Sequence, residues 1–251
     1  MPGNVTRASA VLLALGALAY TAWVLEAVLR TGLDPVRTYV SELAASDQPF
    51  GTFFRATDLV SGTLVLAGAV LGWAGTWRAG TRGAGRADAG PPDGGRARRV
   101  REPWAVLGWG ALALFGAATV ADSRLPLSCA ATADPACAAR ETAGLVPATH
   151  TAHAVSSGLA MTGALVAVVA LTVAARRYGR RPPLARTGPV VVALELAATV
   201  WTLAAVAAFE AGKGSWALGA GQRLQVLLVA VWLAVLAYSL ATSRPTPEEE
   251  R

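Results

Sequence analysis

The sequence predicts an all-α membrane protein, a bundle of six transmembrane helices with both termini in the cytoplasm. Of its 251 residues, 54% are hydrophobic and only 15% are charged, and the mean hydropathy is +0.45. A soluble domain carries about 25% charged residues, so this chain has too few to cover a water-facing surface. The apolar residues also form six runs that are long enough to cross a bilayer, with arginines gathered between them.

The six apolar runs predict one continuous membrane domain over residues 1–251. Arg7 and Arg30 flank the first run, whose length favours a retained transmembrane helix over a cleaved signal peptide. Gly68 and Gly72 in the second run have the spacing of a face for close helix packing. The runs cover residues 8–29, 54–77, 104–121, 149–175, 189–211 and 224–240.

The arginines predict which side of the membrane each connection occupies. Segment 78–102 is rich in glycine, alanine and proline and carries seven arginines against three acids, so we expect a disordered cytoplasmic loop. With six spans, fifteen basic residues share the side of the termini, including the tail 243–251, and seven lie on the other side. This asymmetry indicates a multi-pass protein, which we expect in the cell membrane, and accounts for the net charge of +6 without nucleic-acid binding.

Segment 122–148, between the third and fourth runs, is expected to be an external loop. It contains the only two cysteines of the chain, Cys129 and Cys137. In an oxidising exterior we expect them to form a disulfide, which is favoured over zinc ligation because the CxxC spacing of zinc sites is absent.

The two histidines of the chain, His150 and His153, share one face at the start of the fourth run. Together with Asp122 they could hold zinc and a reactive water, which defines the hypothesis of a metal-dependent membrane hydrolase. The alternative is that both are helix-start residues bonded to water, loop carbonyls or lipid phosphates. Haem is not expected, because two histidines on one helix face cannot supply both axial ligands of one iron. No cofactor is firmly implied.

Several short stretches together resemble the DUF998 family of six-span bacterial membrane proteins. Relatives often have an acid before the first cysteine, where this chain has Ser128. The family is uncharacterised, so the resemblance implies the six-helix architecture and no activity. The resembling parts are YVSELA at 39–44, LVSG at 59–62, RLPLSC at 124–129 with Cys137, the segment of His150 and His153, and GQRLQV at 221–226.

The predicted topology places several polar residues at the outer ends of the spans. One interpretation is an outward-facing pocket lined by Asp58, Asp122, His150, His153 and Arg223, because ionisable groups within spans usually face a wet cavity. The other interpretation is that these residues lie at headgroup depth, where charges are tolerated. We also expect Arg223 to pair with Asp58 or Glu210. Two residues of segment 39–44 are further candidates for the pocket, Ser41 and Glu42.

Glu195 lies about a third of the way into the fifth run, with Thr199 and Thr202 on the same face. We expect it to be protonated or hydrogen-bonded to a neighbouring helix, and a small proton-coupled transporter could use such a group.

The first functional hypothesis is an integral membrane protein whose outer pocket binds a lipid headgroup, a small ligand or a partner. The hydrolase of Asp122, His150 and His153 and the transporter of Glu195 are the alternatives, and the sequence does not decide whether the protein is an enzyme.

Overall fold

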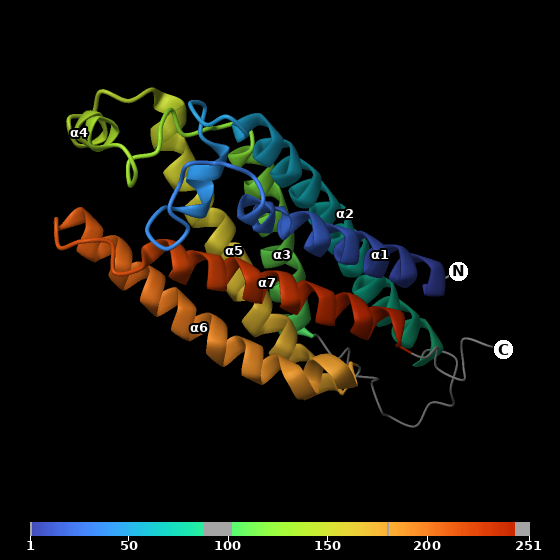
Figure 1. The fold of residues 1–251 in the computed structure, drawn as a ribbon. Helices are drawn as coiled ribbons and strands as arrows, with labels where there is room; N and C mark the ends of the chain where they lie inside the picture. The colour runs from blue at the N-terminus through green and yellow to red at the C-terminus, as the bar shows by residue number, and fades with distance from the viewer. Residues whose placement is uncertain (1, 88–101, 180, 244–251) are drawn as a thin grey trace.

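The computed structural model describes residues 2–87, 102–179 and 181–243, and this part of the chain is all-helical (Figure 1). Six helices are long and apolar enough to cross a membrane, as the sequence predicts. The elements in chain order are α1 (Pro2–Tyr20), the 3-10 helices η1 (Ala22–Ala27) and η2 (Val40–Ala44), α2 (Gly51–Ala87), α3 (Pro103–Asp122), the short α4 (Pro135–Thr142), α5 (Ala148–Tyr178), α6 (Pro182–Glu210) and α7 (Leu218–Ala241).

The six long helices form a closed ring. Going around it, α1 packs on α2, α2 on α3, α3 on α5, α5 on α6, α6 on α7, and α7 back on α1. The first and last spans of the chain are therefore neighbours, and the beginning of α1 and the end of α7 lie at the same end of the bundle (Figure 1). Apolar side chains from the helices fill the interior, among them Leu13, Trp109, Phe115 and Trp232.

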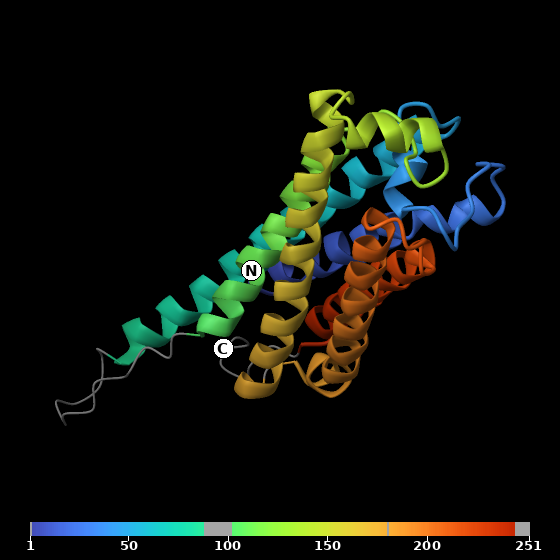
Figure 2. The same cartoon turned by 90° about the vertical axis from the view of Figure 1, so that its left-hand side faces the viewer.

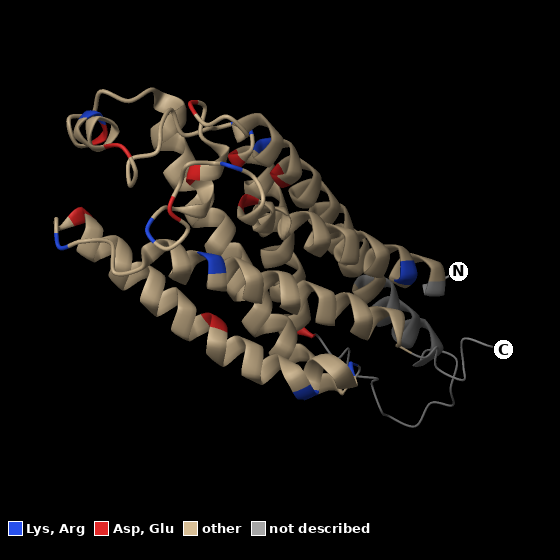
Figure 3. Cartoon of the chain, in the orientation of Figure 1, with Lys and Arg blue, Asp and Glu red and all other residues tan. Residues whose placement is uncertain are grey.

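At the opposite end, which we call the loop end, lie the connections 21–50, 123–147 and 211–217 (Figures 1 and 2). These connections contain η1, η2 and α4. Most of the described acidic residues also lie at this end (Figure 3).

Several helix boundaries differ from the sequence prediction, three of them with a consequence for the fold. The first apolar run does not form one helix to residue 29, because α1 ends at Tyr20 and the chain continues as η1. Helix α2 continues to Ala87, ten residues into the segment that we expected to be disordered, while residues 88–101 lie outside the described residues. Helix α6 begins at Pro182, because proline is well accommodated in the first turn of a helix.

Glycines allow α2, α3 and α5 to approach backbone to backbone. A Cβ atom added at Gly116 of α3 would lie 2.6 Å from the backbone nitrogen of Leu66 and 2.8 Å from the carbonyl oxygen of Gly62, both on α2. A Cβ atom at Gly163 of α5 would lie 2.8 Å from the backbone nitrogen of Phe115. Small residues at such contacts are the common means of packing helices within a membrane.

The glycine face that the sequence predicts on α2 is also used for packing. Gly68 lies against Leu13 of α1, and Gly72 lies against the ring of Trp109 of α3. The two glycines therefore leave space for large side chains from two different neighbouring helices.

We expect Gly116→Ala to lower the free energy of unfolding by about 1–3 kcal/mol, because the added methyl group must push α2 and α3 apart. Thermal unfolding of the purified protein in detergent measures this change. Gly158→Ala on α5 is the matched control, since nothing lies within 4 Å of an added Cβ atom there. Equal loss of stability in both variants would show that the α2–α3 contact is not a tight one.

Candidate functional site

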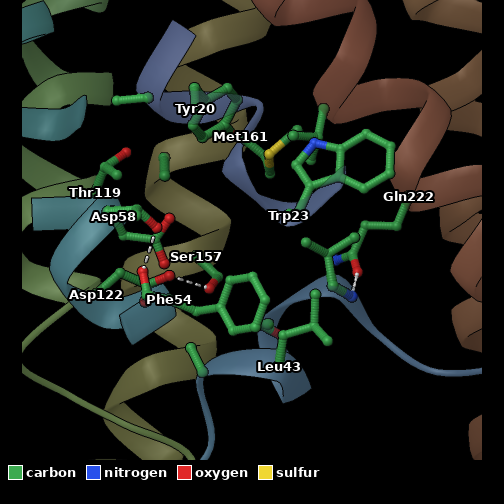
Figure 4. Close-up of a pocket in the computed structure, with 17 residues that line it drawn as sticks. Tyr20, Trp23, Leu43, Phe54, Asp58, Thr119, Asp122, Ser157, Met161 and Gln222 are labelled. Carbon is green, nitrogen blue, oxygen red and sulfur yellow. Dashed lines mark hydrogen bonds between the residues drawn. The ribbon is translucent and has the colours of Figure 1, made fainter. Parts of the chain in front are cut away.

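A cavity of about 100 Å³ lies inside the ring of helices at the loop end (Figure 4). Residues of α1, α2, α3, α5 and α7 line it, and η1 and η2 supply further wall. One side carries the carboxyl groups of Asp58 and Asp122 with the hydroxyl group of Ser157. The other walls are largely apolar and contain Tyr20, Trp23, Leu43, Phe54 and Met161.

Asp122, the last residue of α3, is held by the beginning of α5. The hydroxyl group of Ser157 donates a hydrogen bond to its Oδ2 at 2.7 Å, and the hydroxyl group of Ser156 donates one to its Oδ1. The ring nitrogen Nδ1 of His153 lies 3.1 Å from Oδ1 and 2.9 Å from the carbonyl oxygen of Leu125. These contacts fix the direction of the carboxyl group toward the cavity.

Asp58, on the second turn of α2, lies next to Asp122 on the same side of the cavity (Figure 4). The residues that line the cavity include no lysine, arginine or histidine. The cavity is therefore an acidic site within an otherwise apolar bundle.

His150 and His153 have different partners although they share a helix face. The backbone N–H of Ser128 donates to Nδ1 of His150 at 3.1 Å, so this nitrogen carries no proton and the proton of the neutral ring is on Nε2. Nε2 lies 3.5 Å from a carboxylate oxygen of Glu141. His150 thus connects the loop 123–147 to α5, whereas His153 contacts Asp122.

The structure does not bring the three predicted zinc ligands together. Asp122 contacts His153 and not His150, and the described residues contain no group of three or more His, Cys, Asp or Glu side chains arranged to hold a metal ion. The predicted hydrolase site is therefore not assembled in this part of the chain.

The prediction that Arg223 pairs with Asp58 or Glu210 is wrong, because its partner is Glu26. It forms a two-point ion pair with Glu26 of η1, with both nitrogen–oxygen distances at 2.6 Å and both side chains 8% exposed. Arg223 also donates to the carbonyl oxygen of Thr38 at 2.7 Å. It does not line the cavity and instead joins α7 to η1 and to the segment before η2.

Glu42 is also a structural residue and does not line the cavity. Its carboxylate is buried and accepts hydrogen bonds from the backbone and hydroxyl groups of Thr132 and from the backbone N–H of Tyr39. Burial raises the pKa of Glu42 above its ordinary value, and the hydrogen bonds from Thr132 and Tyr39 offset part of that shift.

The predicted disulfide between Cys129 and Cys137 is present, with Thr132 inside the loop that it closes. Glu42 therefore attaches η2 to the disulfide-closed loop. Ser41 of η2, in contrast to Glu42, is one of the residues that line the cavity.

Glu195 is fully buried between spans and separate from the cavity lining. Neither of its carboxyl oxygens has a hydrogen-bond partner among the described residues. Gln225 of α7 lies beside it but donates to the hydroxyl group of Thr199 at 2.9 Å. The polar neighbour of Glu195 on an adjacent helix is therefore Gln225 of α7.

The sequence prediction missed the apolar walls of the cavity. Tyr20 and Trp23 lie in the second half of the first apolar run and Phe54 begins the second, and aromatic residues near the ends of spans ordinarily indicate the membrane interface. Their spacing carries no signal for a cavity, because they come from three different elements that meet only in the folded ring.

We expect Glu26→Gln and Arg223→Met each to lower the free energy of unfolding by about 3–5 kcal/mol, because each leaves a buried charge without its partner. The double variant should recover part of the loss, and thermal unfolding of all four proteins measures the coupling. Arg37→Met, which breaks the exposed 3.5 Å pair with Asp34, is the control and should cost about 1 kcal/mol or less. Purely additive losses would contradict the buried pair.

Comparison with known protein families gives a match over most of the chain. A family model described as "Protein of unknown function (DUF998)" matches residues 13–87 and 94–239. No curated protein and no solved structure matches the chain. The matched residues reach into all six spanning helices and include the cavity. This protein therefore belongs to the DUF998 family, whose members are proteins of unknown function.

Proposed function

We propose that this integral membrane protein binds a small ligand or a lipid headgroup in the cavity at the loop end, and that this end faces the outside of the cell. The observation that supports binding is the cavity itself, in which two carboxyl groups and a hydroxyl group converge inside an apolar bundle. Pockets that combine apolar walls with a few converging polar groups are typical binding sites.

The distribution of basic residues supports the outward orientation. Fifteen basic residues belong to the termini and to the two connections on their side, and seven belong to the loop end. Loops that are rich in arginine remain in the cytoplasm, so the loop end is proposed to be external. The disulfide of the loop end is consistent with this orientation, because disulfides persist in oxidising compartments.

The volume of the cavity limits the size of the group that can bind in it. Pockets for drug-sized molecules have volumes of about 300–1,000 Å³, whereas this cavity has about 100 Å³. It therefore suits a group of a few heavy atoms, such as a small metabolite or the terminal part of a lipid headgroup.

Binding is better supported than the two alternatives. A hydrolase with Asp122, His150 and His153 as zinc ligands needs the two histidines to converge, but His150 is bound to the loop at Ser128. A transporter using Glu195 needs a path from that residue to the cavity, but Glu195 is not part of the lining.

The orientation can be tested with reporter fusions. A fusion after residue 243 should report a cytoplasmic C-terminus, and a reporter inserted after Gly212, in the α6–α7 connection, should report the external side. The physical reason is the arginine asymmetry, which holds the termini inside. The opposite pattern would place the cavity on the cytoplasmic side and overturn the proposed orientation.

Filling the cavity should abolish binding. Ala19→Phe introduces an aromatic ring into the cavity wall, whereas Leu18→Phe changes the neighbouring side chain, which is 71% exposed on the outside of the bundle. After reconstitution with a bacterial lipid extract, native mass spectrometry should detect a bound species on the wild type and on Leu18→Phe, and not on Ala19→Phe. Helix content and elution volume confirm that each variant is folded. Equal retention by all three proteins would contradict binding in the cavity.

A further inference from the structure

We propose that the ligand of this cavity carries an organic ammonium group, which is bound between the acidic wall of Asp58 and Asp122 and the aromatic walls opposite. This inference rests on the proposed function, because it specifies the chemistry of the same site.

Charge is the first argument. Two carboxyl groups face each other in a site with no basic lining residue (Figure 4). Arg223 is paired with Glu26, so it does not neutralise them. His153, which lies against Asp122, supplies at most one positive charge for the two carboxylates. With both acids ionised, the site therefore has room for one more positive charge, and a cation there would favour the ionised acids over the protonated ones.

The aromatic walls are the second argument. Tyr20, Trp23 and Phe54 line the cavity around and opposite the carboxyl groups, together with the sulfur-bearing side chain of Met161 (Figure 4). Aromatic faces attract ammonium groups, and aromatic cages are a recurring way of recognising them. A metal ion would instead prefer several oxygen ligands at short distance, and the described residues contain no cluster of that kind.

Trp23 supplies a third argument. Its indole nitrogen is buried and has no hydrogen-bond partner among the described residues, although buried indole N–H groups usually have one. The edge of the ring that carries the nitrogen is turned toward Met161, another lining residue (Figure 4). An oxygen atom of the ligand would satisfy this donor once the flexible side chain of Met161, which covers that edge, moves aside. The site therefore fits an ammonium group with an oxygen a short distance away, as in an amino alcohol.

An amino alcohol can be free in solution or can form the headgroup of a phospholipid. The cavity volume of about 100 Å³ accommodates the headgroup alone. The recognition chemistry is the same for both sources, so the experiment must separate them.

Isothermal titration calorimetry on the purified full-length protein tests the charge. Choline and ethanolamine should bind, and the neutral carbon isostere of choline should bind at least about tenfold more weakly, because it lacks the charge that the carboxylates recognise. Asp58→Asn should weaken choline or ethanolamine binding by about tenfold or more for the same reason. Asp47→Asn, an exposed acid outside the cavity, is the matched control and should leave binding unchanged.

A second measurement identifies the source. In nanodiscs that contain equal amounts of phosphatidylethanolamine and phosphatidylglycerol, native mass spectrometry should show phosphatidylethanolamine enriched on the wild type if the ligand is a headgroup. Enrichment without binding of free ethanolamine or choline assigns the site to lipid. Binding of the free compounds without enrichment assigns it to a soluble amine.

The outcomes separate this inference from the proposed function. If the neutral isostere binds as tightly as choline, or if Asp58→Asn binds like the wild type while Ala19→Phe does not bind, the ammonium inference is wrong and binding in the cavity stands. If neither the free ammonium compounds nor phosphatidylethanolamine bind preferentially, the inference is also overturned. If Ala19→Phe retains every bound species, binding does not depend on the cavity, and both the ammonium inference and the proposed function are wrong.

Discussion

The ion pair between Glu26 and Arg223 closes the ring of helices at the end where the cavity lies. The two residues are 197 positions apart, one near the end of the first span and the other near the beginning of the last. Burying either charge alone would be costly, so each requires the other, and their pairing brings η1 against α7. The first turns of α7 then hold the segment that leads to η2, through Arg223 with the carbonyl oxygen of Thr38 and through the side-chain oxygen of Gln222 with the backbone N–H of Val40 at 2.6 Å.

The segment η2 is therefore attached on two sides. Gln222 and Arg223 hold it to α7, and Glu42 holds it to Thr132 in the disulfide-closed loop. Between these attachments its side chains face the cavity. The spanning helices supply the acidic groups and most of the apolar surface, but the position of the remaining wall depends on polar contacts made by the loops and the first turn of α7. Polar residues that the sequence suggests as ligand-binding candidates, such as Glu42 and Arg223, thus hold the wall of the site in place and do not line it.

The sequence was sufficient for the parts of the fold that depend on local composition. Six apolar runs became six helices, and the two cysteines between the third and fourth runs became a disulfide. The prediction was less successful where the outcome depends on which helices are neighbours. Topological depth placed Arg223 at the same end as Asp58 and Glu210, but depth does not give the order of helices around the ring. Because α7 packs on α1 and α6, and not on α2, Asp58 was out of reach, and Glu26 became the partner.

The same limit applies to His150 and His153. Their spacing correctly placed both on α5, but it does not determine which loop atoms each ring meets, and the backbone of Ser128 holds one ring away from Asp122. The pairing of α1 with α7 also has a consequence for biosynthesis. Tyr20 and Gln222 both line the cavity, so its wall contains residues from the first and the last span to be synthesised. The cavity is complete only after the final helix has entered the bilayer, and a nascent or truncated chain that lacks α7 has no enclosed site.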